Sequence, residues 1–331
     1  LKFLDILSNF SYNTSLNILN KKNWMYLKKL FYKLTNKDKH FFYKNTLKKD
    51  NHEKIIKQIY DSDIHAHINR IQNVIQNQNE LSFSHCGHLG DVINSLPAVK
   101  ELSKNHKCKF FIHTEKPLED NAKNYKGFGD EVYLKHKTVD MLMPLFAKLP
   151  YLEKTEKLNN QKIDIDFNLI RKMPINLNID SVRWYFHLTG THGNLNEPYI
   201  YAEPHKFIKN KVVIMRNTRR KNYITNYKFL KNYKDLLFIG LEDEFNDLKK
   251  EVPNLEFYNC KDFLEVAEII KASKFFLGNL SFGYTIAEGL KIPRLLESVP
   301  EFPLVYPNGN NAYDFYFQSH FEKLFDKLYN L

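Results

Sequence analysis

The chain has 331 residues, 43% of them apolar and 26% charged, which is typical of a globular protein long enough for two domains. No apolar run approaches the ~20 residues that a membrane-spanning helix needs, and no signal-peptide pattern opens the chain. The three cysteines, Cys86, Cys108 and Cys260, have no paired spacing, which argues against a disulfide framework and for a reducing compartment. We therefore expect a cytoplasmic protein.

The net charge of +11 is concentrated at the beginning of the chain. Residues 1–60 hold 13 Lys and 4 Asp or Glu, whereas the remainder is nearly balanced. A local excess of this kind indicates a local partner surface rather than a globally basic protein.

Residues 1–80 have the pattern of a separate helical extension. One predicted helix carries apolar side chains on one face and lysines opposite: Trp24, Leu27, Phe31 and Leu34 against Lys29 and Lys33. Packing on the chain's own core is the usual role of such a helix, and binding to an anionic membrane surface is the alternative. No zinc-finger, RNP or basic-zipper signature accompanies the lysines, so we expect no nucleic acid as partner.

The next stretch combines a short apolar run, a glycine turn and an amphipathic helix. Residues 81–83 predict a buried strand, and residues 92–102 place apolar side chains on one helical face. Gly87 and Gly90 between them suit a turn in which another group approaches the backbone closely. Asp91 then falls at the start of the helix, either as a cap or as a carboxylate at the carboxyl end of a parallel strand, where open α/β sheets bind ligands.

Strands and helices alternate from this point, which predicts parallel sheets covered by helices. In the first half we expect strands at 109–113, 131–134 and 163–169 and helices at 139–149 and 181–188. After a polar linker at 194–209, we expect strands at 211–215, 236–239, 255–258, 274–277 and 293–296, and helices at 263–272, 284–290 and from 317 onward. Neither half contains a Walker motif or G-x-G-x-x-G, the fingerprints of P-loop proteins and dinucleotide dehydrogenases.

Two blocks of the sequence resemble one known family. His88-Leu89-Gly90-Asp91-Val92, followed by Leu96-Pro97-Ala98-Val99, resembles the N-terminal signature of the heptosyltransferase-like glycosyltransferases of family 9, which have the GT-B fold. Residues 218–223 and 263–293 are similar to the basic stretch and the helix–strand–turn–helix run of that family's donor domain. The resemblance covers residues 81–297.

The donor turn departs from the family pattern. The family usually has Asp-Ser/Thr-Gly followed by a His, whereas residues 279–285 read Asn-Leu-Ser-Phe-Gly-Tyr-Thr. Lys291 also stands near the position of the usual glycine before Pro293. The identity of the donor sugar is therefore open, and transfer of heptose itself does not follow.

The resemblance implies two Rossmann-like domains that face a cleft. The domain boundaries we expect are 1–80 for the helical extension, 81–205 for the acceptor domain, 206–310 for the nucleotide-sugar domain and 311–331 for a C-terminal helix. It further implies inverting, metal-independent transfer of a hexose or heptose from a nucleotide-diphosphate sugar to a glycan or lipid-linked saccharide, as in lipopolysaccharide biosynthesis. No cofactor is implied, and the location would be cytoplasmic or peripheral at the inner face of the membrane.

The resemblance assigns Asp91 the role of general base, with Gly87, His88 and Gly90 near the acceptor. A diphosphate would be held by backbone N–H groups at a helix N-terminus and by basic side chains. The donor-binding residues we expect are Arg216, Arg219, Arg220, Lys221, Asn279, Ser281, Gly283 and Glu288. His85, Cys86 and His88 lack a fourth ligand at any usual spacing, so we expect no metal. The alternatives are a non-catalytic nucleotide-sugar-binding module, suggested by the altered donor turn, and a nucleic-acid-binding protein that uses the lysine-rich start.

Overall fold

The computed structural model describes residues 17–118, 131–173, 179–299 and 305–331, with side chains from residue 24 onward. The chain separates into two compact units, Leu1–Asp63 and Ile64–Leu331.

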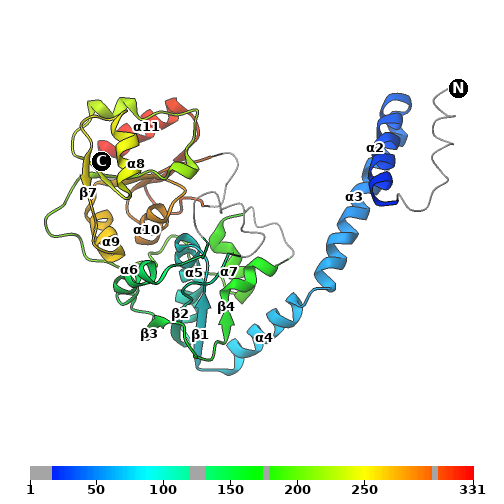
Figure 1. The fold of residues 1–331 in the computed structure, drawn as a ribbon, viewed down its shortest axis with the longest axis horizontal. Helices are drawn as coiled ribbons and strands as arrows, with labels where there is room; N and C mark the ends of the chain where they lie inside the picture. Colours follow the sequence, from blue (N-terminus) through cyan, green and yellow to red (C-terminus); the bar gives the residue numbers. More distant parts are fainter. Residues whose placement is uncertain (1–16, 119–130, 174–178, 300–304) are drawn as a thin grey trace. The chain divides into compact units, whose positions relative to one another are not determined.

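The first unit is a pair of helices, α2 (Asn17–Thr35) and α3 (Lys37–Tyr60) (Figure 1). Asn36 joins them and caps α3, because its side chain accepts a hydrogen bond from the N–H of Lys39 at 2.9 Å. Tyr32 and Tyr43 meet edge to face between the helices, with ring centroids 5.7 Å apart. No described side chain of α3 is buried, and no described helix of the chain is long and apolar enough to cross a bilayer.

The second unit begins with α4 (Ile64–Asn77), whose Ile64 and Ile71 are buried. The side chain of Gln72 donates a hydrogen bond to the carbonyl of Thr189 at 2.7 Å. Residues 64–80, which the sequence analysis groups with the extension, therefore pack within the second unit instead.

The first sheet has four parallel strands in the order β3-β2-β1-β4. The strands are β1 (Glu80–His85), β2 (Lys107–Ile112), β3 (Lys154–Lys157) and β4 (Ile165–Asp166). The helices of this half are α5 (Leu89–Leu102), α6 (His136–Phe146), α7 (Ser181–Thr189) and the short 3-10 helix η2 (Phe167–Lys172).

The second sheet has six parallel strands in the order β10-β9-β8-β5-β6-β7, the strand order of the Rossmann fold. The strands are β5 (Val212–Met215), β6 (Leu236–Ile239), β7 (Glu256–Tyr258), β8 (Phe275–Asn279), β9 (Arg294–Glu297) and β10 (Ala312–Phe315). The helices are α8 (Glu242–Lys249), α9 (Phe263–Ala272), α10 (Phe282–Leu290), α11 (Gln318–Tyr329), η3 (Thr218–Arg220) and η4 (Lys228–Asn232). Because β10 pairs with β9 and α11 packs on both strands, residues 312–329 belong to this sheet rather than forming a separate element.

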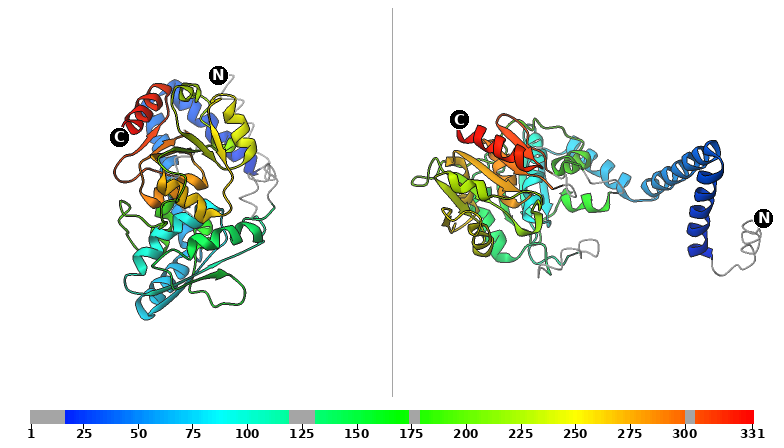
Figure 2. Two further views of the ribbon diagram at one scale, coloured as in Figure 1. Left: turned by 90° about the vertical axis from the view of Figure 1, so that its left-hand side faces the viewer. Right: turned by 90° about the horizontal axis from the view of Figure 1, so that it is seen from above.

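The predicted fold class, a helical N-terminal segment followed in the chain by two Rossmann-like α/β halves, is confirmed. The two halves occupy separate parts of the second unit (Figure 2) and meet through helices, α5 against α10 and α6 against α9. A single hydrophobic cluster runs from Phe83 and Leu96 in the first half to Ile286 and Phe276 in the second. In each sheet the strand order reverses at one point, between β1 and β4 and between β5 and β8. Loops diverge at such points and leave a crevice at the carboxyl ends of the strands, where ligands bind.

One predicted strand is wrong, and another is shorter than predicted. Residues 131–134 form no strand; an isolated antiparallel bridge joins Val132 to Pro117. The strand predicted at 163–169 stops at Asp166, because the Asp166 side chain accepts a hydrogen bond from the N–H of Asn168 at 3.0 Å and starts η2.

Gly278 at the reversal point of the second sheet has no room for a side chain. A Cβ there would lie 2.7 Å from the backbone oxygen of Met215 on the neighbouring strand. We expect Gly278→Ala to lower the free energy of unfolding by about 1–3 kcal/mol, as overpacking in a core does, measured by urea denaturation. Gly90→Ala is the matched control, because a Cβ at Gly90 meets only Thr285, at an ordinary 3.7 Å. Equal urea midpoints for the two variants would contradict the steric argument.

Candidate functional site

A cavity of about 390 Å³ lies between the two halves of the second unit, a volume in the range of small-molecule sites. Both reversal points contribute to its walls. The residues that line it are His88, Leu89, Gly90, Asp91, Asn94, Val132, Tyr133, Leu134, Lys135, Thr138, Arg171, Ser181 and Trp184 from the first half, and Asn217, Arg219, Arg220, Leu280, Ser281, Phe282, Thr285 and Val305 from the second.

Two helix N-termini face this cavity. His88 precedes α5 and Ser281 precedes α10, and neither makes a side-chain capping hydrogen bond. The first hydrogen bonds within the helices are those from Val92 to His88 and from Thr285 to Ser281. The N–H groups before them have no partner inside the helix, and together with the helix dipoles they favour an anion.

The charged side chains of the cavity wall are mostly cationic. They are Lys135, Arg171, Arg219 and Arg220, with Asp91 as the one carboxylate among the described lining residues. Because both helix N-termini add positive potential, the cavity suits a ligand with more than one negative charge.

Asp91 lies in the first turn of α5 and forms an ion pair with Arg171, whose Nη2 is 2.8 Å from Asp91 Oδ2. The two side chains are only 21% and 17% exposed. Burial disfavours the charged form of Arg171, but the charge of Asp91 and the nearby Tyr133 and Tyr185 outweigh it and raise the pKa of Arg171. Asp91 thus has a guanidinium beside it that fixes the direction of its carboxylate.

Gly87 provides the room for this ion pair. A Cβ at Gly87 would lie 2.8 Å from Nη2 of Arg171 and 3.0 Å from Cβ of Asp91. Gly87 does not line the cavity, and Cε1 of His85 would lie nearer still, at 2.6 Å, so the His85 ring and the guanidinium together leave no room for a side chain there. Gly90 and His88 line the cavity as expected.

His85 lies behind Asp91 and is fully buried. Its Nδ1 accepts a hydrogen bond from the N–H of Gly87 at 2.8 Å, so Nε2 carries the proton and donates to the hydroxyl of Tyr185 at 2.8 Å. That hydroxyl donates to the backbone oxygen of Asp91 at 2.9 Å. Burial lowers the pKa of His85 to about 3, so His85 is a neutral support of the turn before α5.

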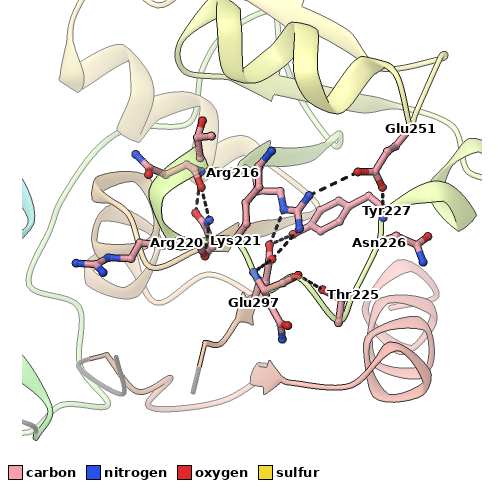
Figure 3. Close-up of polar contacts among 12 residues, drawn as sticks. Arg216, Arg220, Lys221, Thr225, Asn226, Tyr227, Glu251 and Glu297 are labelled. Carbon is pink, nitrogen blue, oxygen red and sulfur yellow. Dashed lines mark hydrogen bonds and ion pairs between the residues drawn. The ribbon is translucent and has the colours of Figure 1, made fainter. Parts of the chain in front are cut away.

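The basic loop after β5, residues 217–222, is fixed in place by a buried cluster of side chains (Figure 3). The carboxylate of Glu297, at the end of β9, accepts hydrogen bonds from Nε and Nη2 of Arg216 at 2.7 and 2.8 Å. It also accepts from the N–H of Asn222 at 2.6 Å and from the hydroxyl of Tyr227 at 2.8 Å. Arg216 is only 4% exposed and stacks on Tyr227, 4.2 Å from the ring centroid. Glu297 therefore joins the two ends of the loop, Arg216 and Asn222, and Arg216 lies outside the cavity.

Asn279, at the end of β8, holds the same loop from the other side. Its Oδ1 accepts from the N–H of Asn217 at 2.8 Å, and its Nδ2 donates to the carbonyls of Asn217 and Arg220 at 2.7 and 2.9 Å. Asn279 is fully buried, so it positions the loop that presents Arg219 and Arg220.

Three further donor-site candidates also lie outside the cavity. Lys221 pairs with Asp247, and Gly283 packs against Met215. Glu288 is buried, where Arg294 donates to it at 2.5 Å and Lys291 pairs with it. Its carboxylate is thus engaged by two cations and is not presented to a ribose. Arg219, Arg220 and Ser281 line the cavity.

Sequence reasoning missed Arg171, Tyr133 and Trp184 as cavity residues. Arg171 was hidden because residues 163–169 alternate like a strand, which leaves no reason to examine the turn that follows. A cation in the turn after β4 becomes a candidate partner of Asp91 only once β1 and β4 are known to pair.

No group of described residues could hold a metal ion. The three cysteines are free. Burial raises the pKa of Cys86 to about 11 and those of Cys108 and Cys260 to about 12, so none of them is a thiolate nucleophile at neutral pH.

No protein-family model and no curated protein matches the sequence. Among solved structures, the chain is similar to glycosyltransferases of family 9. A family 9 glycosyltransferase from Veillonella parvula matches with a TM-score of 0.46 and 10% identity over 75% of this chain and 88% of that one. The Escherichia coli heptosyltransferase WaaC with ADP gives 0.45 and 11% over 76% and 99%. The E. coli ADP-heptose lipopolysaccharide heptosyltransferase II gives 0.42 and 9% over 76% and 98%. We therefore build the proposed function on the side chains of this chain.

The buried neutral His85 makes stability depend on pH. In the unfolded chain the imidazole takes up a proton below about pH 6.5, whereas in the folded chain it does so only near pH 3. The contribution of neutral His85 to the free energy of unfolding is therefore fully present above pH 6.5. It is lost as the pH falls, by at most about 1.4 kcal/mol per pH unit. We expect His85→Gln to flatten the fall in unfolding free energy between pH 6.5 and 4, measured in urea. The exposed His192, changed to Gln, is the control, and equal slopes for the two variants would refute the assignment.

Asn279 acts on the cavity through the basic loop. We expect Asn279→Ala to weaken binding of inorganic pyrophosphate about tenfold, since loss of about 1.4 kcal/mol corresponds to tenfold in Kd, measured by calorimetry. Asn254→Ala is the matched control, because the Asn254 amide donates to the carbonyl of Tyr233 at 2.6 Å in a loop that does not line the cavity. The positioning role fails if both variants bind pyrophosphate as the unaltered chain does.

Proposed function

We propose that the protein is a glycosyltransferase that moves a sugar from a nucleotide-diphosphate donor to a saccharide acceptor. The observation that carries the proposal is one carboxylate, Asp91, in a cavity whose other described charged side chains are cations and which two helix N-termini face. A reaction that removes a proton from a hydroxyl and releases a diphosphate needs both the carboxylate, as a base, and the positive groups, which stabilise the diphosphate.

On the donor side, the diphosphate is bound at the N-terminus of α10 and beside Arg219 and Arg220. Backbone N–H groups after Ser281 are preorganised donors for phosphate oxygens. As the bond between the anomeric carbon and the diphosphate oxygen breaks, that oxygen keeps the electron pair, and the fixed donors and guanidinium groups stabilise the new charge. No metal is required for this stabilisation, since the cations of the chain supply it.

On the acceptor side, Asp91 is the general base. Arg171 engages Oδ2, which leaves Oδ1 to take the proton of the acceptor hydroxyl. The hydroxyl oxygen then forms the new bond to the anomeric carbon, and the single displacement inverts that centre. A positioned base of this kind contributes about 10²–10⁴ in rate.

The finer assignments follow from the resemblance of the sequence to family 9. They are a hexose or heptose donor, a glycan or lipid-linked saccharide acceptor of the lipopolysaccharide type, and a cytoplasmic location. The donor turn at residues 279–285 is the part of the chain that departs from the family pattern, and Asn279 in this turn is held by the loop contacts described above. We propose that this turn affects which sugar the protein transfers.

A non-catalytic nucleotide-sugar-binding module is the second candidate. The observation that favours it is the ion pair itself, because Arg171 already engages Oδ2 of the one carboxylate among the described lining residues. The two candidates differ in turnover and share the binding of the donor.

The Asp91→Asn variant distinguishes the glycosyltransferase from the non-catalytic binding module. We expect this variant to lower kcat by about 10²–10⁴ while the Kd for the nucleotide product changes less than about threefold. The assay is release of nucleoside diphosphate from a panel of nucleotide sugars with saccharide acceptors. Asp140→Asn is the matched control, since Asp140 is an exposed partner of Lys157 outside the cavity.

Undiminished turnover of Asp91→Asn would remove the base assignment. Donor binding by the unaltered chain without release of nucleotide from any acceptor pair would establish the binding module instead.

A further inference from the structure

We propose that the helix pair α2–α3 binds the surface of an anionic lipid bilayer. This inference is independent of the proposed function. On α2, the apolar face predicted from the sequence is open to solvent rather than covered: Trp24 is 44% exposed, Leu27 43%, Phe31 37% and Leu34 78%. Within its own unit, α2 therefore leaves part of this apolar face uncovered by α3.

On α3, large apolar side chains stand at both ends of one helical face. Phe41 and Phe42 are 67% and 75% exposed, and Tyr60 is 75% exposed beside Ile55 and Ile56. The two groups are about four helical turns apart and share one side of the helix, as 3.6 residues per turn dictates. Polar residues, among them Lys48 and His52, lie on the same side between them, so α3 presents two separate apolar groups along a basic helix.

The exposed apolar surface of the chain is concentrated in this unit. Eleven of the eighteen exposed large hydrophobic side chains among the described residues lie between Trp24 and Tyr60. Contiguous exposed apolar patches mark protein or membrane interaction sites.

Charge decides which partner fits. Residues 24–60 hold ten Lys and three acidic residues, so a second copy of this unit would bring two strongly positive surfaces together. A nucleic acid would meet the lysines, but aliphatic Leu27, Leu34 and Ile55 have no face on which bases stack. A bilayer with anionic headgroups accommodates both the apolar side chains and the lysines. The apolar side chains enter the headgroup–acyl boundary, and the lysines contact the phosphates.

The experiment uses the full chain with vesicles of phosphatidylcholine alone or with added phosphatidylglycerol. We expect sedimentation with the anionic vesicles, weakened by salt, and a blue shift of tryptophan emission. Trp184 is only 8% exposed, so the shift reports Trp24, and Trp24→Phe should lose the shift while the chain still sediments.

Two sets of variants test the two parts of the surface. Leu30→Ser with Leu34→Ser should abolish sedimentation, and Lys29→Gln with Lys33→Gln should lower the partition coefficient about fivefold per lysine. The matched control, Lys231→Gln with Lys323→Gln, changes exposed lysines of the second unit and should partition as the unaltered chain does.

Three results would overturn the proposal. They are equal partitioning of the unaltered chain and the Leu30/Leu34 variant, a dimer in sedimentation velocity that buries Trp24 without lipid, and tighter salt-sensitive binding to single-stranded DNA than to anionic vesicles.

Discussion

The structure of the second unit depends on one constraint, the reversal of strand order in each of its two parallel sheets. Chain segments leave β1 and β4, and likewise β5 and β8, in opposite directions. Side chains that follow these strands therefore meet from positions far apart in the sequence, as Asp91 meets Arg171 and Asn279 meets Asn217. Packing of α5 on α10 then brings the two reversal points to one cavity.

The proposed function makes two conflicting electrostatic demands on the cavity. Stabilising a diphosphate needs positive potential, which two helix N-termini and the guanidinium groups provide. A general base needs a carboxylate that still attracts a proton, and positive potential opposes that. The ion pair with Arg171 fixes the direction of the Asp91 carboxylate and engages its Oδ2. Which task prevails is the difference between an enzyme and a binding module.

Many of the polar residues near the cavity support it rather than line it. Glu297, Arg216 and Tyr227 share one buried network that fixes the loop carrying Arg219 and Arg220 (Figure 3). Burying such charges is favourable only when every partner is satisfied. The polar residues that sequence inspection selects around a phosphate site thus divide into those that bind and those that hold the binding loop in place.

The sequence by itself determined the α/β class, the glycine turn before Asp91 and the amphipathic character of α2, because these depend on local periodicity and on residue preferences for turns and caps. Only the tertiary structure decided that Arg171 faces Asp91 and that Glu288 and Arg216 are engaged in buried ion pairs. A charged residue has the same sequence pattern whether it faces a ligand or a buried counter-charge. The choice between them depends on strand pairing and helix packing across the chain, which local sequence does not encode.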